Sequence, residues 1–182
     1  RLAVTDRCNL RCQYCMPAQG IDIVPRQELL SYKEMYRLIR VLTELGVKKV
    51  RLTGGEPFVR KDFVSFLEML SYNDLLDEIN ITTNGALISK HISKIEKLEK
   101  VKKINLSIDS LDKDKFAKIT RRDVFSEVYK TFEILEKSSL DLKLNVVVQS
   151  GFNTDEIVDF VRLTKDKNVA VRFIEEMPFN GK

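Results

Sequence analysis

Three cysteines lie close together near the start of the chain. Cys8, Cys12 and Cys15 fall in the segment TDRCNLRCQYCMP, which follows a short apolar run, and the rest of the sequence contains no further cysteine. Three thiolates on one loop can hold an iron–sulfur cluster and leave one iron open to a small molecule. The odd number and the short spacing argue against a disulfide framework and favour metal ligation in a reducing compartment.

Two other interpretations of the cysteines are a structural zinc site and three free thiols. Structural zinc almost always has four closed ligands, whereas the single histidine, His91, lies far away in a predicted helix. We therefore favour a redox-active cluster that is bound by the three thiolates and keeps one metal corner vacant.

Other chemically suggestive segments come at the ends of predicted strands. They are RLTGGEP at 51–57, TTNG at 82–85, SIDS at 107–110, VVQSG at 147–151 and EEMP at 175–178. Paired glycines allow a close approach of the backbone, whose free amide and carbonyl groups can hold a zwitterion, and Glu56 is a candidate to orient its ammonium group. All these turns belong to the carboxyl ends of the strands, where barrel enzymes keep their active sites.

The elements that must position these turns alternate between strand and helix patterns. We predict strands at 2–5, 48–53, 78–83, 103–109, 142–149 and 170–176, and helices at 31–45, 62–72, 88–99, 112–120, 124–138 and 154–167. Such alternation is typical of repeated right-handed parallel units in one sheet. Helix starts are indicated by Ser31 with Glu34 and by Thr154, and a helix end by Gly46.

The predicted strands alternate apolar and polar residues, unlike a parallel sheet that is covered on both faces. In the second strand Val50 and Leu52 alternate with Arg51 and Thr53, and the later strands follow the same rule. The apolar set must face the helices, so the polar set faces an interior that is wet or occupied. We therefore predict the α/β class and an incomplete (β/α)6 parallel barrel, TIM-like, with a ligand in its lumen.

Cations from four predicted strands share the inward parity. They are Arg1, Arg51, Lys143 and Arg172, and Asp109 is the clearest acid among them. Unpaired cations are costly to bury, so their gathering favours an anionic ligand in the lumen. The alternative, that individual side chains reach the rim and meet water, stays open at this point.

Length and composition restrict the class of protein. At 182 residues, with 43% hydrophobic and 32% charged residues, the chain suits one soluble domain. The net charge of +4 is modest and the lysines are interspersed with acids, which disfavours a nucleic-acid partner. No apolar run is long enough to cross a bilayer and no targeting peptide is recognisable, so we expect a cytoplasmic protein.

The cysteine loop, with an aromatic residue before its last cysteine, and the later GGEP segment resemble the radical S-adenosylmethionine superfamily. More narrowly, the chain is similar to the molybdenum cofactor biosynthesis protein A family, whose members are GTP 3',8-cyclases. The similarity runs in order and spacing through RLAVTDRCNLRCQYCMP, VRLTGGEPFVRKD, ITTNG, NLSIDSLD, ITRRD, LKLNVVVQSGFN and VRFIEEMP. It covers essentially the whole chain.

The resemblance implies a radical enzyme, a lyase of molybdenum cofactor (molybdopterin) biosynthesis. In that family, an electron from an external donor passes through a 4Fe-4S cluster, and S-adenosylmethionine is split into methionine and a 5'-deoxyadenosyl radical. The radical takes the ribose 3' hydrogen of GTP, and ring closure onto C8 gives (8S)-3',8-cyclo-7,8-dihydroguanosine 5'-triphosphate. The downstream partner is cyclic pyranopterin monophosphate synthase. The oligomeric state stays open, a homodimer being one option.

The resemblance also implies roles residue by residue. The catalytic and metal-binding cluster ligands would be Cys8, Cys12 and Cys15, the S-adenosylmethionine-binding residues Tyr14, Gly55, Ser107 and Met177, and the GTP-binding residues Arg1, Arg51, Thr82 and Lys143. Three of the four GTP positions coincide with inward cations, and strand parity favours Thr82 over Thr83. Arg172 is a further candidate contact for a phosphate or a carboxylate.

The chain departs from the family beyond EEMP. Family members continue into a region with three more cysteines, which hold a second 4Fe-4S cluster that grips guanine, and end in a pair of glycines. We expect residues 1–182 to form the radical S-adenosylmethionine core domain, truncated at both ends and lacking the second-cluster region. The chain would then retain the S-adenosylmethionine site and most phosphate contacts but cyclise GTP poorly or not at all.

Two other functions compete with this one. The first is a radical S-adenosylmethionine enzyme that acts on a peptide or another small molecule, against which the inward Arg51 and Lys143 favour a polyanion. The second is a non-catalytic iron–sulfur module for electron transfer or regulation, which would form no 5'-deoxyadenosine. Arg121 and Arg122 can reach a phosphate, but a pair of arginines at a helix end is more typical of a solvent-facing position.

Overall fold

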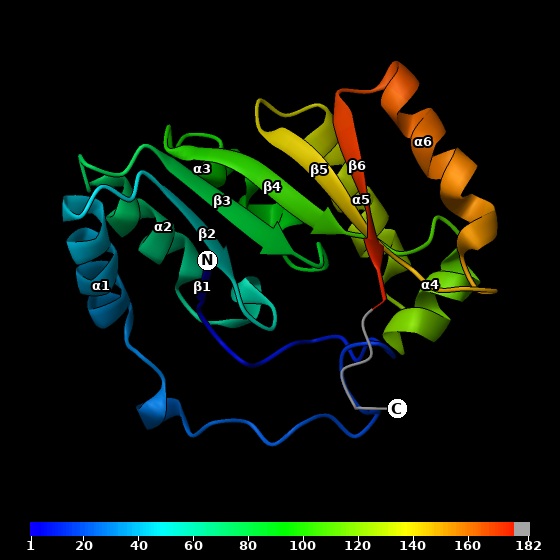
Figure 1. Ribbon diagram of the computed structural model, residues 1–182, viewed down its shortest axis with the longest axis horizontal. Helices are drawn as coiled ribbons and strands as arrows, with labels where there is room; N and C mark the ends of the chain where they lie inside the picture. The colour runs from blue at the N-terminus through cyan, green and yellow to red at the C-terminus, as the bar shows by residue number, and fades with distance from the viewer. Residues whose placement is uncertain (177–182) are drawn as a thin grey trace.

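Six parallel strands form one sheet in the computed structural model, which describes residues 1–176 (Figure 1). The strands are β1 (Leu2–Ala3), β2 (Lys49–Thr53), β3 (Glu78–Thr83), β4 (Val101–Ser107), β5 (Asp141–Val148) and β6 (Val169–Glu175). They pair in sequence order, and β1 and β6 form the two edges. The sheet is therefore open, which confirms the predicted incomplete barrel of the α/β class.

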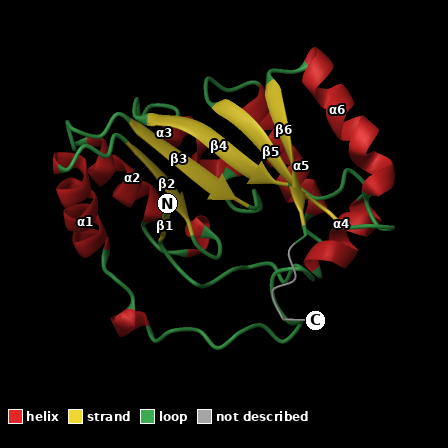
Figure 2. Ribbon diagram, in the orientation of Figure 1, coloured by secondary structure: helices red, strands yellow, loops and turns green. Residues whose placement is uncertain are grey.

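The helices between the strands lie along one face of the sheet (Figure 2). They are α1 (Tyr32–Glu44), α2 (Phe63–Ser71), α3 (Ile92–Ile95), α4 (Lys113–Thr120), α5 (Phe125–Glu136) and α6 (Ile157–Asp166), with 3-10 turns η1 (Arg26–Glu28), η2 (Pro57–Val59), η3 (Ser89–His91) and η4 (Thr154–Glu156). The opposite face of the strands is turned toward the viewer in Figure 1 and is not covered by helices. Within the described part of the chain, no helix is both long and apolar enough to span a membrane.

The alternating pattern separates the two faces as predicted. Leu52, Ile81, Leu106 and Leu144 come from four neighbouring strands, and each has an exposed fraction of 0%. Their burial beneath the helices removes apolar surface from water, which is the main driving force for this layer. Phe173 belongs to the same set but is 37% exposed, because β6 is an edge of the sheet.

The predicted start and end of α1 are confirmed. The Ser31 hydroxyl accepts a hydrogen bond from the Glu34 backbone N–H, and the Glu34 carboxylate accepts one from the Ser31 N–H, so the helix begins with a capping box. After the helix, Gly46 adopts a φ of +97°, and its N–H donates to the Thr43 carbonyl. This left-handed residue ends the helix and turns the chain towards β2.

The helix predicted at 88–99 is shorter in the structure than we expected. The segment forms η3 and the one-turn helix α3. After α3 the backbone hydrogen bonds tighten, with the Leu98 N–H donating to the Ile95 carbonyl and the Val101 N–H to the Leu98 carbonyl. These tight bonds turn the chain directly into β4 and leave no length for a further helical turn.

The prediction that Thr154 caps the last helix is wrong. Thr154 lies inside η4, and α6 begins at Ile157 without a side-chain cap. The reason is that Glu156, at the end of η4, turns its carboxylate inward to accept hydrogen bonds from the Leu111 and Asp112 backbone N–H groups. Tertiary hydrogen bonds thus replace the local cap that the sequence indicates.

A long segment between β1 and α1 crosses the edge of the sheet at the carboxyl ends of the strands (Figure 1). It contains all three cysteines and passes below the strand ends before η1 returns it to α1. The fold therefore brings the cysteine loop to the edge where the predicted strand-end motifs meet.

Candidate functional site

The cysteine loop curls through a tight turn between its second and third cysteines. The backbone N–H groups of Cys15 and Met16 both donate to the Cys12 carbonyl, at 2.9 Å and 3.1 Å. Cys8 and Cys12 are half-buried, whereas Cys15 is exposed. The Leu10 N–H donates to the Cys8 sulfur at 3.4 Å, so the backbone wraps around the first thiol.

The thiols lie close enough together to influence one another. Burial raises the pKa of Cys12 to about 12, and the nearby Asp109, Cys8 and Cys15 add to the increase. Burial also raises the pKa of Cys8, with smaller contributions from Glu56 and Cys15. Metal binding to this loop must therefore displace protons from the thiols.

The donor set of the loop fits an iron–sulfur cluster. Within residues 1–176, no three His, Cys, Asp or Glu side chains converge as ligands of one metal ion. A single tetrahedral ion would draw three sulfurs to about 4 Å from one another. In a cubane each thiolate binds a different iron, so three thiolates on one loop suit a cluster with one open iron, whereas a closed structural zinc site needs a fourth ligand.

The paired glycines that follow β2, Gly54 and Gly55, lie directly against the backbone that enters the cysteine loop. The Gly55 N–H donates to the Thr5 carbonyl at 2.6 Å, and the Glu56 N–H donates to the Arg7 carbonyl at 2.8 Å. A Cβ on Gly54 would lie 2.3 Å from the Thr5 oxygen, and one on Gly55 would lie 2.2 Å from the Arg7 oxygen. Only glycine allows this approach.

Glu56 joins two of the strand-end turns. Its Oε1 accepts hydrogen bonds from the Phe58 N–H and the Thr83 hydroxyl, and its Oε2 accepts one from the Asn84 N–H at 2.6 Å. Burial raises the pKa of Glu56 to about 7, although the hydrogen bonds act in the opposite direction. Both oxygens are occupied by neighbouring loops, so this geometry does not support Glu56 as the residue that orients an ammonium group.

The predicted S-adenosylmethionine residues lie around the same edge, except one. The Tyr14 hydroxyl donates to the Asp109 carboxylate at 2.7 Å, which ties the cysteine loop to the end of β4. Ser107 is half-buried at the last position of β4. Gly55 belongs to the turn described above, whereas Met177 lies outside the described residues.

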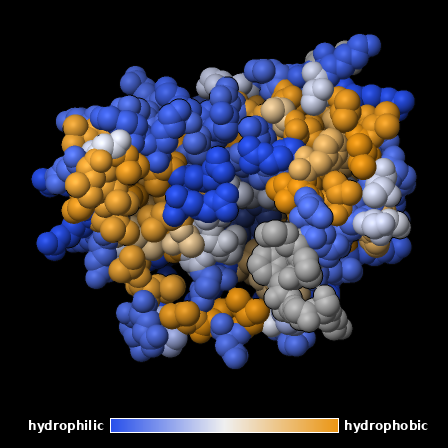
Figure 3. Space-filling view, viewed as in Figure 1, coloured by the Kyte–Doolittle hydropathy of each residue, from blue (hydrophilic) through white to orange (hydrophobic). Residues whose placement is uncertain are grey.

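Cations gather on the open face of the sheet, as the parity predicted. Burial lowers the pKa of Lys143, and the nearby Arg172, Lys103 and Arg51 lower it further. Strongly hydrophilic side chains also gather over the middle strands in Figure 3. Arg1 precedes Leu2, the register partner of Leu52, and so lies beside the Arg51 position.

Polar atoms on this face lack hydrogen-bond partners. Within the described residues, the buried Arg51 Nε and the side-chain oxygens of Asn80, Asn105 and Asn145 have none. Thr82 is half-buried and stands in register with Asn105. Unpaired buried polar groups are costly, so their gathering beside the cations fits a polar, anionic ligand.

Sequence reasoning missed Lys103, and it included Asn84 only as part of the TTNG segment, without a role of its own. Lys103 belongs to the inward row, in register with Asn80, and its signal was available because it shares the parity of the other inward residues of β4. The Asn84 amide donates to the Asn9 side chain and also reaches the Cys8 sulfur at 3.7 Å. No local pattern indicates this second contact, because it joins residues far apart in the chain.

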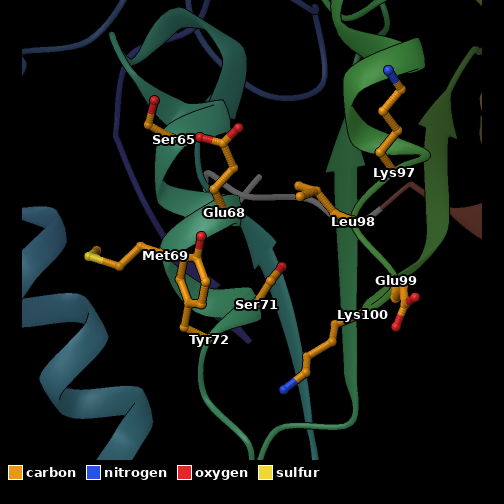
Figure 4. A pocket seen from close by; sticks show the side chains of 9 residues that line it. All are labelled: Ser65, Glu68, Met69, Ser71, Tyr72, Lys97, Leu98, Glu99 and Lys100. Carbon is orange, nitrogen blue, oxygen red and sulfur yellow. The ribbon is translucent and has the colours of Figure 1, made fainter.

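Cleft size alone does not locate the site. A cleft of about 710 Å³ lies between α2 and the connection from α3 to β4, lined by residues such as Met69, Tyr72 and Lys97 (Figure 4). It contains no cysteine and no strand-end motif. A cleft of about 540 Å³ instead lies between the cysteine loop and the glycine turn, against Cys15 and Gly55. We place the site there because its lining carries the chemistry.

The family model described as Radical SAM superfamily matches residues 2–164. The chain therefore belongs to the radical S-adenosylmethionine superfamily. Solved structures agree on the fold: Streptococcus suis SuiB superimposes with a TM-score of 0.80 at 19% identity over 98% of this chain and 40% of that chain. The structure of anSMEcpe with bound AdoMet gives a TM-score of 0.75 at 19% identity, over 96% of this chain and 48% of that chain.

Within the superfamily, the chain is similar to proteins of molybdenum cofactor biosynthesis, as predicted. It is 49% identical to molybdenum cofactor biosynthesis protein moc-5 of Caenorhabditis elegans over 100% of this chain and 30% of that protein. It is 45% identical to the GTP 3',8-cyclase of Desulforamulus reducens, over 98% of this chain and 55% of that protein. The chain thus spans about half, or less, of the length of these relatives.

The raised pKa of Glu56 predicts a pH-dependent stability in the metal-free protein. Because the folded-state pKa is about 7 and the ordinary value is 4.5, the contribution of this group is fully present below pH 4.5 and is lost as the pH rises through 7. Glu56→Gln should flatten the slope of unfolding free energy against pH in this window. It should also cost about 1–3 kcal/mol, because the Asn84 N–H loses its acceptor.

Urea unfolding at several pH values measures both effects. The exposed Glu99→Gln is the matched control, and it should retain the wild-type slope. Equal slopes for wild type and Glu56→Gln would contradict the expectation.

Gly55→Ala should disrupt the contact between the glycine turn and the cysteine loop. The new Cβ would lie 2.2 Å from the Arg7 oxygen, so the loop must shift, at a cost of about 3 kcal/mol. Gly151→Ala is the control, because Gly151 has a φ of +71° but no atom within 4 Å of an added Cβ, so strain alone costs about 1 kcal/mol. Denaturant unfolding compares the two variants, and equal stabilities would refute the close-approach argument.

Proposed function

We propose that this chain binds a 4Fe-4S cluster through Cys8, Cys12 and Cys15, binds S-adenosylmethionine beside it, and acts on GTP in molybdenum cofactor biosynthesis. The observation that carries the proposal is the position of a three-thiol loop next to a sheet face that is rich in cations. The similarity to GTP 3',8-cyclases along the whole chain supports the choice of substrate and product. The product would be (8S)-3',8-cyclo-7,8-dihydroguanosine 5'-triphosphate.

When bound, the cluster supplies the electron that splits S-adenosylmethionine and so provides the radical that acts on GTP. The residues of this chain supply position. The lining of the cleft beside Gly55 would hold the amino acid portion of S-adenosylmethionine, with Tyr14 and Ser107 at its sides. Met177 is proposed as a contact by family resemblance alone. The partial burial of Cys8 and Cys12 would limit the access of water to the reacting groups, whereas Cys15 is exposed.

The cationic face would hold the triphosphate. Arg51 and Lys143 lie near each other across the sheet, and Arg172 lies near Lys143. Arg1 and Thr82 would complete the contacts at the neighbouring strands. A triphosphate would neutralise the repulsion among these cations, and its oxygens would accept hydrogen bonds from their N–H groups. Unfavourable repulsion would thus be replaced by charge-assisted hydrogen bonds.

The remaining partners of the proposal come from the family. An external electron donor would reduce the cluster, and cyclic pyranopterin monophosphate synthase would take the product. Since the relatives are longer, we propose that a second 4Fe-4S cluster belongs to a region outside this sequence and contributes to binding of the guanine base. The 182-residue chain alone should then bind both small molecules but cyclise GTP poorly.

Removal of single inward cations should weaken GTP binding. Arg51→Ala and Lys143→Ala should each raise the Kd for GTP about tenfold or more at fixed salt, the scale of a lost charge-assisted hydrogen bond. Both variants should stay folded, because each removes a charge that repels its neighbours. Titration calorimetry measures the Kd.

Lys102→Ala is the control for this experiment. Lys102 is an exposed lysine of β4 with the opposite parity to Lys103, and its loss should leave GTP affinity unchanged. An unchanged Kd in the inward variants, or an equal loss in Lys102→Ala, would point to another substrate, such as a peptide.

The cysteine loop should be required for cleavage of S-adenosylmethionine. After anaerobic reconstitution with iron and sulfide and reduction by dithionite, the wild-type chain should form 5'-deoxyadenosine. The triple variant Cys8→Ala, Cys12→Ala, Cys15→Ala should hold no iron chromophore and form no 5'-deoxyadenosine. A wild-type chain that holds the cluster but forms no 5'-deoxyadenosine would instead indicate a non-catalytic iron–sulfur module.

A further inference from the structure

The cysteine loop is docked on the carboxyl end of α4. The Arg11 N–H donates to the Thr120 carbonyl at 3.0 Å, and the Gln13 N–H donates to the Ile119 carbonyl at 2.9 Å. The Gln13 side chain donates to the Lys118 carbonyl at 2.7 Å. The last carbonyls of a helix have no partner within it, and are usually satisfied by the residues that follow or by water. Here three of them are satisfied by the cysteine loop.

Arg121 directly follows α4 and reaches back to the same loop. Its Nη1 donates to the Arg11 carbonyl at 2.8 Å and to the Met16 carbonyl at 2.9 Å. These two carbonyls flank the segment that contains Cys12 and Cys15. A single guanidinium therefore joins both ends of the turn that carries two of the three thiols. The expectation that Arg121 faces solvent is wrong, and the reason is this pair of long-range hydrogen bonds.

The backbone of Arg121 is held in an unfavourable conformation. Its φ of 53° and ψ of 31° lie in the left-handed region, where glycine is the usual residue after a helix. Within the described residues, only Asp62 and Arg121 among the non-glycine residues have a positive φ. The strain is compensated only if the side chain makes contacts that glycine cannot make, and its two hydrogen bonds to the loop are such contacts.

We propose that Arg121 is a positioning residue that holds the cysteine loop in a shape ready to receive its metal group. Arg121 touches the loop carbonyls and none of the thiols, so it acts through the backbone. Its cation also lies at the negative end of the α4 dipole, where a positive charge is favourable. The identity of the metal group rests on the proposed function, whereas the ordering of the loop by Arg121 does not.

Arg122 provides a matched control. It is the next residue, carries the same charge and is exposed, and its Nη1 donates only to the neighbouring Arg121 carbonyl. Arg122→Ala therefore changes charge and helix-end composition but leaves the loop contacts intact.

The first measurement uses metal-free protein. Hydrogen exchange of the amides of Arg11, Gln13 and Cys15, and alkylation of Cys12 by iodoacetamide, should accelerate about tenfold in Arg121→Ala and stay at wild-type rates in Arg122→Ala. Arg121→Gly separates positioning from stability. Glycine relieves the strained φ and should raise or preserve the melting temperature, yet it should accelerate exchange and alkylation as Arg121→Ala does. Arg121→Lys, with a single donor group, should fall between.

The second measurement uses reconstituted protein. During exposure to EDTA, the decay of visible absorbance measures how fast each chain loses iron. This loss should be several-fold faster in Arg121→Gly than in wild type or Arg122→Ala. Wild-type loop protection and chromophore decay in Arg121→Gly would overturn the proposal. If wild type and Arg121→Gly both form 5'-deoxyadenosine and show the same loop protection and chromophore decay, only the positioning role is rejected. If loop protection changes in Arg121→Gly but no protein, wild type included, takes up a cluster, only the proposed function is rejected.

Discussion

The backbone of the glycine turn after β2 lies against the backbone that leads from β1 into the cysteine loop. β1 itself is only two residues long, so it cannot fix the direction of the loop alone. The hydrogen bonds from Gly55 to Thr5 and from Glu56 to Arg7 continue the parallel pairing of β1 and β2 past the strand ends. The first thiol, Cys8, follows immediately. Its position at the sheet edge therefore depends on a contact that any side chain at Gly55 would prevent.

The loop is then held at two further places by polar contacts. Tyr14 donates to Asp109 at the end of β4, and the N–H groups of Arg11 and Gln13 donate to the end of α4. Irregular backbone with little apolar packing must find partners for its polar groups, and these partners come from elements far apart in the sequence. Glu56 uses the same device between the β2 and β3 turns. A network of hydrogen bonds thus holds the loops together at the carboxyl edge of the sheet.

The parts of this arrangement that depend on local patterns could be predicted from sequence. Strand parity is a local property with a period of two, so it identified Arg51 and Lys143 as inward cations and separated Thr82 from Thr83. Capping at Ser31 and the turn at Gly46 are local too. Contacts between distant segments could not be predicted in this way. The orientation of Arg121 depends on Met16, 105 residues earlier, and the inward turn of Glu56 depends on Asn84.

The two faces of the sheet differ in character: one is buried and apolar, and the other is polar and cationic. The helix-covered face buries Leu52, Ile81 and their neighbours completely, and carries the hydrophobic energy of the fold. The open face brings Lys143 near three other cations, an arrangement that costs free energy in the absence of an anion. Lys103 has an acidic partner, Asp141, at 3.3 Å. A polyanion that neutralised this face would bind the folded chain and not the unfolded one, so its binding would stabilise the fold by linkage. The alternation that builds the core on one side thereby leaves a row of polar and cationic side chains on the other, which is the surface that we propose for the anion.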